Sequence, residues 1–323
     1  MFKMMLFFLL TLLLSNSNCQ IYINKTILSN QFTFDNLANS IDLNNQNIVE
    51  INNETFSGFS NLEYLMLSSN QLTSLDDCTF KGLFNLKWLH LDKNKLGVLE
   101  AELLSDLTNL KILRFSSNIL QLIESGSFDQ LANLEELRLE SNNLIALSDD
   151  LFKKLINLKW LYLSNNKLRQ INMVMFNQLS NLQELRLEQN FISYINSTGF
   201  NNNIKSLEYL DLSNNQLTSI SVELSTNLKS LKKLWLNKNL ITEFESNVFS
   251  NYFSLEWLRL DENKIKRIEN FMFKDLHYLQ ILNLESNMLV YFNRYALKEL
   301  HSIKKVCLFT YASFILFSIS KDL

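Results

Sequence analysis

The chain has 323 residues, of which 47% are hydrophobic and 20% charged, and its formal net charge at pH 7 is -3. This composition is typical of a globular protein rather than a disordered one. The nearly balanced charge gives no electrostatic reason to expect nucleic acid or an anionic membrane as a partner. The sequence has no proline and only 5 glycines, whereas a compact α/β fold normally uses many of both in its turns. Other residues must therefore form the turns, and the abundant asparagines are the candidates.

The N-terminus is typical of a signal peptide. An apolar run from Met4 to Leu14 follows a single lysine and precedes a polar stretch that ends at Cys19. Because this run is short for a membrane span, we expect residues 1–19 to be a cleaved signal peptide rather than a membrane anchor. The mature protein is then secreted into the extracellular space, with the cell surface as the alternative location.

Two further features bear on secretion. Cleavage after Cys19 leaves Cys78 and Cys307, which are too few and too far apart in sequence for a disulfide framework, and the sequence leaves open whether they are free. Acceptor sequences for N-linked glycosylation begin at Asn24, Asn53 and Asn196.

A repeat of 24 residues runs through most of the chain. The segment from Leu62 to Leu72 recurs from Leu134 to Leu144 and again from Leu207 to Leu217. One apolar marker per unit shows the spacing, which is 24 residues everywhere except for one interval of 25. The markers are Ile41, Leu65, Leu89, Leu113, Leu137, Leu161, Leu185, Leu210, Leu234, Leu258, Leu282 and Val306. The sequence therefore predicts about 12 stacked units that bury a shared core.

Each unit contains a short strand followed by a turn. In the pattern Leu-x-Leu both leucines point the same way, as a strand with one buried face requires. An asparagine follows five residues after most markers, and its amide can satisfy turn carbonyls and amides inside the coil. This predicted asparagine ladder consists of Asn70, Asn94, Asn118, Asn142, Asn166, Asn190, Asn215, Asn239, Asn263 and Asn287.

A second row of apolar residues lies ten positions after the asparagines. It should stack behind the sheet as a spine of mostly phenylalanine rings. Its members are Phe80, Leu104, Phe128, Phe152, Phe176, Phe200, Phe249, Phe273 and Leu297.

The repeated unit resembles the extracellular "typical" 24-residue leucine-rich-repeat family, and the resemblance covers about nine-tenths of the chain. It implies an α/β horseshoe-shaped solenoid with a curved parallel sheet on its concave face. It also implies a role as a receptor ectodomain, adhesion protein or matrix protein that binds a ligand there. Two departures stand out: no cysteine-bridged caps are visible, and Gln46 and Tyr311 replace the asparagine in the first and last units.

Strand alternation identifies the residues that face outward on the concave side. They lie one before, one after and three after each marker. All four tryptophans occupy such positions, and Trp, Tyr and Arg are the residue types that dominate protein–protein hot spots. The predicted ligand-binding residues are Tyr64, Trp88, Arg114, Arg138, Trp160, Tyr162, Arg186, Tyr209, Trp235, Trp257 and Arg259.

Two clusters are expected on this face, because adjacent strands lie about 4.8 Å apart. One places Arg138, Tyr162 and Arg186 side by side, with glutamates in the neighbouring columns. The other brings together Lys233, Trp235, Trp257, Arg259 and Asp261. The competing interpretation of the first cluster is a self-satisfied stack of cations, rings and carboxylates with no ligand.

The sequence contains no constellation typical of an enzyme. His90, His277 and His301 are isolated, and no paired cysteine motif, calcium loop or phosphate-binding glycine loop occurs. We therefore expect no catalytic residue, no metal site and no cofactor.

The ends of the solenoid need caps, because an open coil exposes its core and an unpaired strand edge. Residues 20–37 are expected to form an N-terminal cap without disulfides, and residues 38–302 hold repeats 1–11. Residues 303–323 are interpreted as a degenerate last repeat with an apolar cap, since Val306 and Leu308 keep the register. The alternatives are a membrane-attachment tail through residues 306–320, which is not favoured, and truncation of a longer receptor.

The favoured function is a secreted binding or adhesion protein that recognises an extracellular protein or glycan. The alternative is a membrane-attached or truncated recognition receptor ectodomain of the Toll-like or adhesion type. An inert matrix component is a third class. The sequence names neither the ligand nor the oligomeric state.

Overall fold

The computed structural model describes residues 21–24, 39–201, 203–245, 247–293 and 295–308. The predicted signal peptide, most of the predicted N-terminal cap and the apolar residues 309–323 lie outside the described residues. The chain divides into two compact units, residues 1–158 and residues 159–323. They are called the N-terminal and C-terminal units, and each is described by itself.

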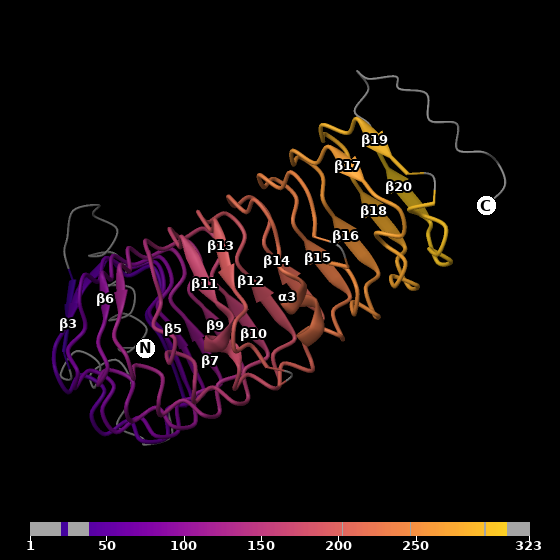
Figure 1. Ribbon diagram of the computed structural model, residues 1–323. Coiled ribbons are helices and arrows are strands. Elements are labelled where there is room, and N and C mark those ends of the chain that lie inside the picture. The colour runs from indigo at the N-terminus through magenta and orange to yellow at the C-terminus, as the bar shows by residue number, and fades with distance from the viewer. Residues whose placement is uncertain (1–20, 25–38, 202, 246, 294, 309–323) are drawn as a thin grey trace. The chain divides into compact units, whose positions relative to one another are not determined.

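The main sheet of the N-terminal unit consists of parallel strands from successive repeats. The predicted markers lie opposite one another, with Ile41 paired to Leu65 and so on to Leu137. In sheet order the strands are β2 (Ser40–Asp42), β4 (Tyr64–Met66), β5 (Trp88–His90), β7 (Ile112–Arg114) and β9 (Glu136–Arg138). They lie side by side in chain order (Figure 1). The predicted register is therefore confirmed in this unit.

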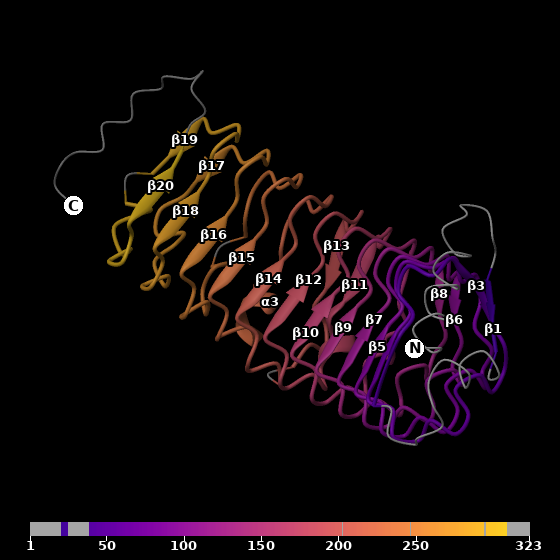
Figure 2. The ribbon, with the colours of Figure 1, turned by 180° about the vertical axis from the view of Figure 1, so that it is seen from behind.

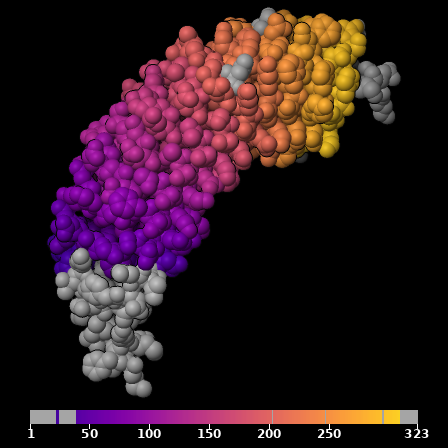
Figure 3. All heavy atoms as spheres, turned by 90° about the horizontal axis from the view of Figure 1, so that it is seen from below, coloured from indigo at the N-terminus to yellow at the C-terminus, as the bar shows by residue number. Residues whose placement is uncertain are grey.

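The C-terminal unit repeats the same arrangement. Its parallel strands are β10 (Trp160–Tyr162), β12 (Glu184–Arg186), β14 (Tyr209–Asp211), β15 (Lys233–Trp235), β16 (Trp257–Arg259), β18 (Ile281–Asn283) and β20 (Lys305–Cys307). Val306 pairs with Leu282, so the predicted last strand is present and in register. In Figure 3 the colour bands of each unit succeed one another in chain order, as expected of coils that stack on their neighbours.

The single 25-residue interval is accommodated without disturbing the sheet, because Leu185 still pairs with Leu210. In the preceding repeat Phe176, Leu179 and Leu182 are buried at spacings of three, whereas Phe200 is followed by buried Ile204 and Leu207. The extra residue therefore lies between Phe200 and Ile204 in the sequence.

The return segments of the coils carry short paired strands and little helix. The parallel pairs are β1 (Ile21–Ile23) with β3 (Ile48–Ile51), β6 (Val98–Leu99) with β8 (Leu122–Ile123), β11 (Gln170–Asn172) with β13 (Tyr194–Asn196), and β17 (Arg267–Ile268) with β19 (Tyr291–Phe292). Figure 2 shows β1 beside β3. The helices with described bounds are the 3₁₀-helix η1 (Met173–Phe176) and α3 (Val222–Asn227). No helix among the described residues is long and apolar enough to cross a membrane.

The core consists of the leucine rows and the phenylalanine spine. The marker leucines of both units are buried, and each such side chain contributes about 1.5–3 kcal/mol. Within the spine Phe128 and Phe152 stack with ring centroids 6.2 Å apart. Phe56, which the missing asparagine of the first repeat concealed, extends the spine by stacking 6.2 Å from Phe80. Leu297 is only half-buried, and the neighbouring Ala296 is buried instead.

The asparagine ladder is confirmed in atomic detail. The Asn94 Oδ1 accepts a hydrogen bond from the amide of Leu72 at 3.1 Å, while its Nδ2 donates to the carbonyls of Leu67 and Leu91, each at 3.0 Å. Asn239 makes the same three contacts in the C-terminal unit. Each asparagine thus links the backbones of adjacent coils, where unpaired groups would be costly.

The residue before each asparagine makes the turn. Ser69, Lys93 and Gln189 have φ values of 58°, 54° and 57°, the left-handed region that non-glycine residues rarely adopt. Such a conformation costs roughly 1–2 kcal/mol per residue, which the hydrogen bonds of the following asparagine offset. This explains how the chain turns with so few glycines.

A second row of asparagines lies outside the coil, four residues before the markers of the N-terminal unit. The exposed Asn109 donates from Nδ2 to the carbonyl of Phe84 at 2.8 Å, and Asn133 does the same to Thr108 at 2.9 Å. In most repeats of the C-terminal unit the same position is serine, with Asn181 and Tyr278 as exceptions, and the Ser206 hydroxyl donates to the carbonyl of Ser180 at 3.0 Å. This row was not predicted from the sequence, although its spacing is also 24 residues.

Candidate binding surface on the main sheet

The solvent side of the main sheet holds all the predicted ligand-binding residues. We call it the sheet face, defined as the residues one before, one after and three after each marker. Burial alternates along the strands. The central residue is buried in every strand of the main sheet from β2 to β18 and half-buried in β20, and its neighbours are mostly less buried. None of the four tryptophans lies in the core: Trp88 is exposed, and Trp160, Trp235 and Trp257 are half-buried. That these residues bind a ligand remains a prediction.

In the N-terminal unit the rings pack on one another. Tyr64 meets Trp88 edge to face with centroids 5.1 Å apart, and Trp88 stacks on His90 at 6.1 Å. The Nε2 atom of His90 is buried and has no hydrogen-bond partner among the described residues. Burial and, after it, the positive charge of Arg114 lower the pKa of His90.

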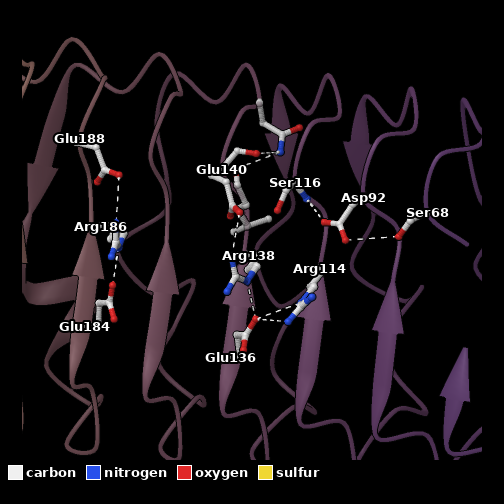
Figure 4. Close-up of polar contacts among 12 residues, drawn as sticks. Ser68, Asp92, Arg114, Ser116, Glu136, Arg138, Glu140, Glu184, Arg186 and Glu188 are labelled. Atoms are coloured by element: carbon white, nitrogen blue, oxygen red, sulfur yellow. Dashed lines mark hydrogen bonds and ion pairs between the residues drawn. The ribbon is translucent and has the colours of Figure 1, made fainter. Parts of the chain in front are cut away.

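The arginines of this unit gather around one carboxylate. The Oε1 atom of Glu136 lies 3.0 Å from Arg114 Nη2 and also accepts from Arg138 Nε. Arg138 extends its other side towards Glu140, with Nη1 to Oε1 at 3.5 Å. Figure 4 shows Glu136 between the two guanidiniums. Two cations thus share the buried carboxylate of Glu136, and Glu140 supplies the second negative charge that balances them.

Arginine is placed differently in the C-terminal unit. The Arg186 guanidinium lies over two rings, 5.0 Å from the centroid of Tyr209 and 5.7 Å from that of Tyr162. Its Nε donates to Glu184, and its Nη1 is 4.0 Å from Glu188 Oε1. Figure 4 shows Arg186 between these two glutamates.

The neighbouring strands continue this row of rings and cations. Tyr209 meets Trp235 edge to face at 5.1 Å, and Arg259 covers the Trp235 ring at 5.4 Å while pairing with Asp261 at 2.9 Å. Burial, followed by the charge of Asp211, raises the pKa of Tyr209. In a separate contact the Lys233 ammonium lies 4.8 Å from the centroid of Trp257. The second predicted cluster is therefore assembled.

The first predicted cluster is assembled in part. Tyr162 and Arg186 are in contact within the C-terminal unit, while Arg138 belongs to the N-terminal unit. The contact between Arg138 and Tyr162 stays a prediction. Sequence reasoning placed Tyr209 on the face but missed that it lies against both Arg186 and Trp235.

With this geometry in hand, the comparison with family models is decisive. The "Leucine rich repeat" model matches residues 37–96, 84–144, 132–192, 205–265 and 253–308, which is most of the chain. The chain belongs to the leucine-rich repeat family. No curated protein matches it.

Leucine-rich repeat proteins of solved structure share the fold. A chain of the LRIM1/APL1C complex superimposes with a TM-score of 0.71 at 20% identity, covering 88% of this chain and 54% of that one. A chain of the Toll–Spatzle complex, from Drosophila, gives 0.63 at 20% identity, covering 81% and 38%. FLRT2, in an octameric complex with Latrophilin 3 and Unc5D, gives 0.67 at 26% identity, covering 76% and 74%. This chain thus spans about half of the LRIM1/APL1C chain and less of the Toll–Spatzle one.

The predicted glycosylation sites lie away from the sheet face of this leucine-rich repeat chain. Asn53 is exposed, and the hydroxyl of Thr55 in the same acceptor sequence is buried against the carbonyl of Ile23. The Asn196 Oδ1 accepts from the amide of Thr198 at 3.0 Å. Asn24 is half-buried, and the rest of its acceptor sequence lies outside the described residues. Glycosylation at all three stays a prediction.

The described residues carry no group of three or more His, Cys, Asp or Glu side chains placed to hold a metal ion. Cys78 and Cys307 are free thiols in the structure. The side chains that the sheet face presents are mainly rings, guanidiniums and carboxylates.

Proposed function

We propose that this leucine-rich repeat protein, of the 24-residue extracellular subtype, is secreted and binds a protein ligand through the sheet face of its C-terminal unit. The observation that carries the proposal is the row Tyr162, Arg186, Tyr209, Trp235 and Arg259, in which rings and cations alternate across neighbouring strands. Fixed Trp, Tyr and Arg side chains of this kind are the usual anchors of protein interfaces.

The arrangement of the rings favours a protein over a glycan. A sugar stacks on an open ring face, but Trp235 is held between Tyr209 on one strand and Arg259 on the other. A face of Trp257 is likewise occupied by Lys233, and Lys159 lies 5.7 Å from the centroid of Trp160. The rings are thus engaged with cations, and their edges and the guanidiniums are what a partner meets.

The relatives agree with a role in protein recognition. FLRT2, at 26% identity, was solved in a complex with Latrophilin 3 and Unc5D. We propose by analogy that this chain is a non-enzymatic extracellular recognition module.

The test is capture of partners from extracellular material by the immobilised secreted chain. The variant Trp160→Ala/Tyr162→Ala/Trp235→Ala should lose the proteins that the wild type captures. The matched control Met66→Ala/His90→Ala/Ile112→Ala removes three sheet-face side chains of the N-terminal unit, outside the proposed site, and should retain them. Equal capture by the wild type and the first variant would overturn the proposed site.

Secretion is tested separately by fractionating expressed protein between medium and membranes, with and without residues 303–323. Recovery in the medium in both cases is the expected result. Membrane retention that disappears on deletion of residues 303–323 would replace the secreted protein by a membrane-attached receptor.

A further inference from the structure

Buried polar atoms without a hydrogen-bond partner among the described residues lie on the sheet face of both units. Three belong to the N-terminal unit, namely His90 Nε2, Ser116 Oγ and Glu140 Oε2, and three lie on one stretch of the C-terminal unit. Among the described residues, Glu188 Oε2, Trp235 Nε1 and Asn237 Oδ1 are buried and have no hydrogen-bond partner. Asn237 is only 5% exposed. Glu188 follows strand β12, Trp235 lies on β15 and Asn237 follows β15. Nearly all buried polar groups in folded proteins are paired, so these three unpaired atoms call for an explanation.

The same stretch holds more negative charge than its cations neutralise. Arg186 donates its Nε to Glu184 and is 4.0 Å from Glu188, which is a weak contact for an ion pair. The side chain of Asp211, a residue that is 2% exposed, accepts from the neutral Tyr209 hydroxyl and the Ser213 amide, both at 2.9 Å, and forms no ion pair within 4 Å among the described residues. Burial and, after it, the charge of Asp211 raise the pKa of Glu188.

Asp261, by contrast, is fully neutralised by an arginine on the same sheet face. Both of its oxygens accept from Arg259, at 3.1 Å and 2.9 Å. Paired, fork-like contacts of this kind are the strong form of an arginine–carboxylate interaction. Glu188 and Asp211 have no such partner among the residues described.

We infer that the part of the sheet face between Glu188 and Asn237, over strands β12, β14 and β15, binds an extended, basic polypeptide segment. A Lys or Arg side chain of this segment lies beside Glu188 and Asp211, and its peptide groups meet Trp235 Nε1 and Asn237 Oδ1. This inference rests on the proposed function and specifies its partner. A peptide group offers a carbonyl to the indole N–H and an N–H to the amide oxygen, so one main chain satisfies both orphans.

The dimensions agree with this occupant. In sheet order β12, β14 and β15 are neighbours, so Glu188 and Asn237 are two strand spacings apart, about 10 Å. Three extended residues span about that distance. Rotation of the Glu188 carboxylate, whose side chain is 20% exposed, brings its unpaired oxygen towards an incoming cation.

The experiment measures binding of short, end-blocked peptides to the full chain by calorimetry at low salt. The probes are a basic peptide of alternating arginine and serine, its acidic counterpart with glutamate, and the basic peptide with a methylated backbone. We expect the basic peptide to bind, the acidic one not to bind, and backbone methylation to weaken binding by about fivefold, since it removes the donor for Asn237.

Variants locate the site. Glu188→Gln should weaken binding of the basic peptide by about tenfold, and Asn237→Leu by about fivefold. The control Glu262→Gln makes the same charge change at an exposed residue, 3.5 Å from Lys238 and off the sheet face, and should alter affinity by less than about twofold. Thermal unfolding checks that each variant is folded.

Equal affinity for the basic and acidic peptides, or equal effects of Glu188→Gln and Glu262→Gln, would overturn the inference. Undiminished binding of the methylated peptide would overturn the main-chain contact. If protein capture depends on Trp160, Tyr162 and Trp235 while the peptides show no charge preference, this inference fails and the proposed function stands. If the basic peptide depends on Glu188 while capture is unchanged in the triple variant, the proposed function fails instead.

Discussion

The two units build the same sheet from the same repeat but present different chemistry on it. In the N-terminal unit, Arg114 and Arg138 share the carboxylate of Glu136, and the rings of Tyr64 and Trp88 pack on each other. In the C-terminal unit, Arg186 and Arg259 lie over rings instead. The inward residues determine the fold and are of the same types in both units, whereas the outward residues differ in type and in contacts between the units. The comparison therefore predicts that the inward residues of both units contribute equally to stability, and it agrees with the proposal that ligand binding belongs mainly to the C-terminal unit.

Substitutions in the asparagine ladder test whether the inward residues are equivalent. Asn94→Ala and Asn239→Ala each leave one buried amide, that of Leu72 or of Leu217, without its partner. Each also removes one of the two asparagine donors from two buried carbonyls, which keep the donor of a neighbouring ladder asparagine. At about 1–3 kcal/mol for the stranded amide, with a smaller loss at the carbonyls, we expect each substitution to lower the free energy of unfolding by about 2–4 kcal/mol. Denaturant unfolding measures this loss. The exposed Asn109→Ala is the control and should cost about 1 kcal/mol or less. A large difference between Asn94→Ala and Asn239→Ala would break the equivalence.

Substitution of a single ring tests whether binding belongs to the C-terminal unit. Trp235→Ala removes the ring between Tyr209 and Arg259 and should weaken binding of the captured partner by about 2 kcal/mol or more, as expected for a hot spot. Met66 occupies the same position, one after the marker, in the N-terminal unit, and Met66→Ala should change the affinity little. Surface plasmon resonance with the purified partner measures both. A larger loss for Met66→Ala would move the site to the other unit.

Removal of one carboxylate charge from the sheet face of each unit tests how differently the two units hold their arginines. Glu136→Gln removes the negative charge that Arg114 and Arg138 share and leaves Arg138 with Glu140. Because both guanidiniums are about one-third exposed, the substitution should cost about 1 kcal/mol at low salt. Glu184→Gln should cost less, because Arg186 keeps the rings of Tyr162 and Tyr209. Thermal unfolding at low and high salt measures the difference, which salt should reduce. Equal costs would show that the rings contribute nothing to holding Arg186.

Much of this architecture was predictable, because a strict period leaves few choices. Leucines at the markers must face inward, so the register follows from their spacing, and the asparagine ladder follows from the hydrogen-bonding capacity of a side-chain amide. The left-handed residue before each asparagine was not predictable from residue type, since serine, lysine and glutamine all adopt it. Phe56 was missed because Gln46 conceals the first repeat.

The sheet face was predictable as a set of residues but not as a set of contacts. Alternation shows that Arg186 points outward. It does not decide between the carboxylate of Glu184 and the ring of Tyr209, because several partners lie within one strand spacing. The unpaired atoms of Trp235 and Asn237 likewise depend on how neighbouring side chains pack over them, which a period of 24 residues does not encode.

Acid should also change the stability of the two units in opposite directions, through one sheet-face residue in each. This is the smallest effect expected. Burial and Arg114 lower the pKa of His90 in the folded N-terminal unit below its ordinary value of 6.5. As the pH falls through that value the unfolded chain binds the proton first, so the wild type should lose stability relative to His90→Gln. Burial and Asp211 raise the pKa of Glu188 above its ordinary value of 4.5. Here the folded chain binds the proton first, so acidification should stabilise the wild type relative to Glu188→Gln.

The measurement is the midpoint of thermal unfolding for the wild type and the two variants between neutral pH and about the ordinary pKa of glutamate. Glu188→Gln should be the more stable protein at neutral pH, because it removes a charge that the folded state holds at a cost, and its advantage should shrink as the pH falls. Over the same range the unfolding midpoint of His90→Gln should rise relative to that of the wild type as the pH falls. Parallel pH profiles for the two variants would contradict the contrast between the faces. A Glu188→Gln protein that is more stable yet binds the basic peptide less tightly would show that this carboxylate is retained for recognition at the expense of stability.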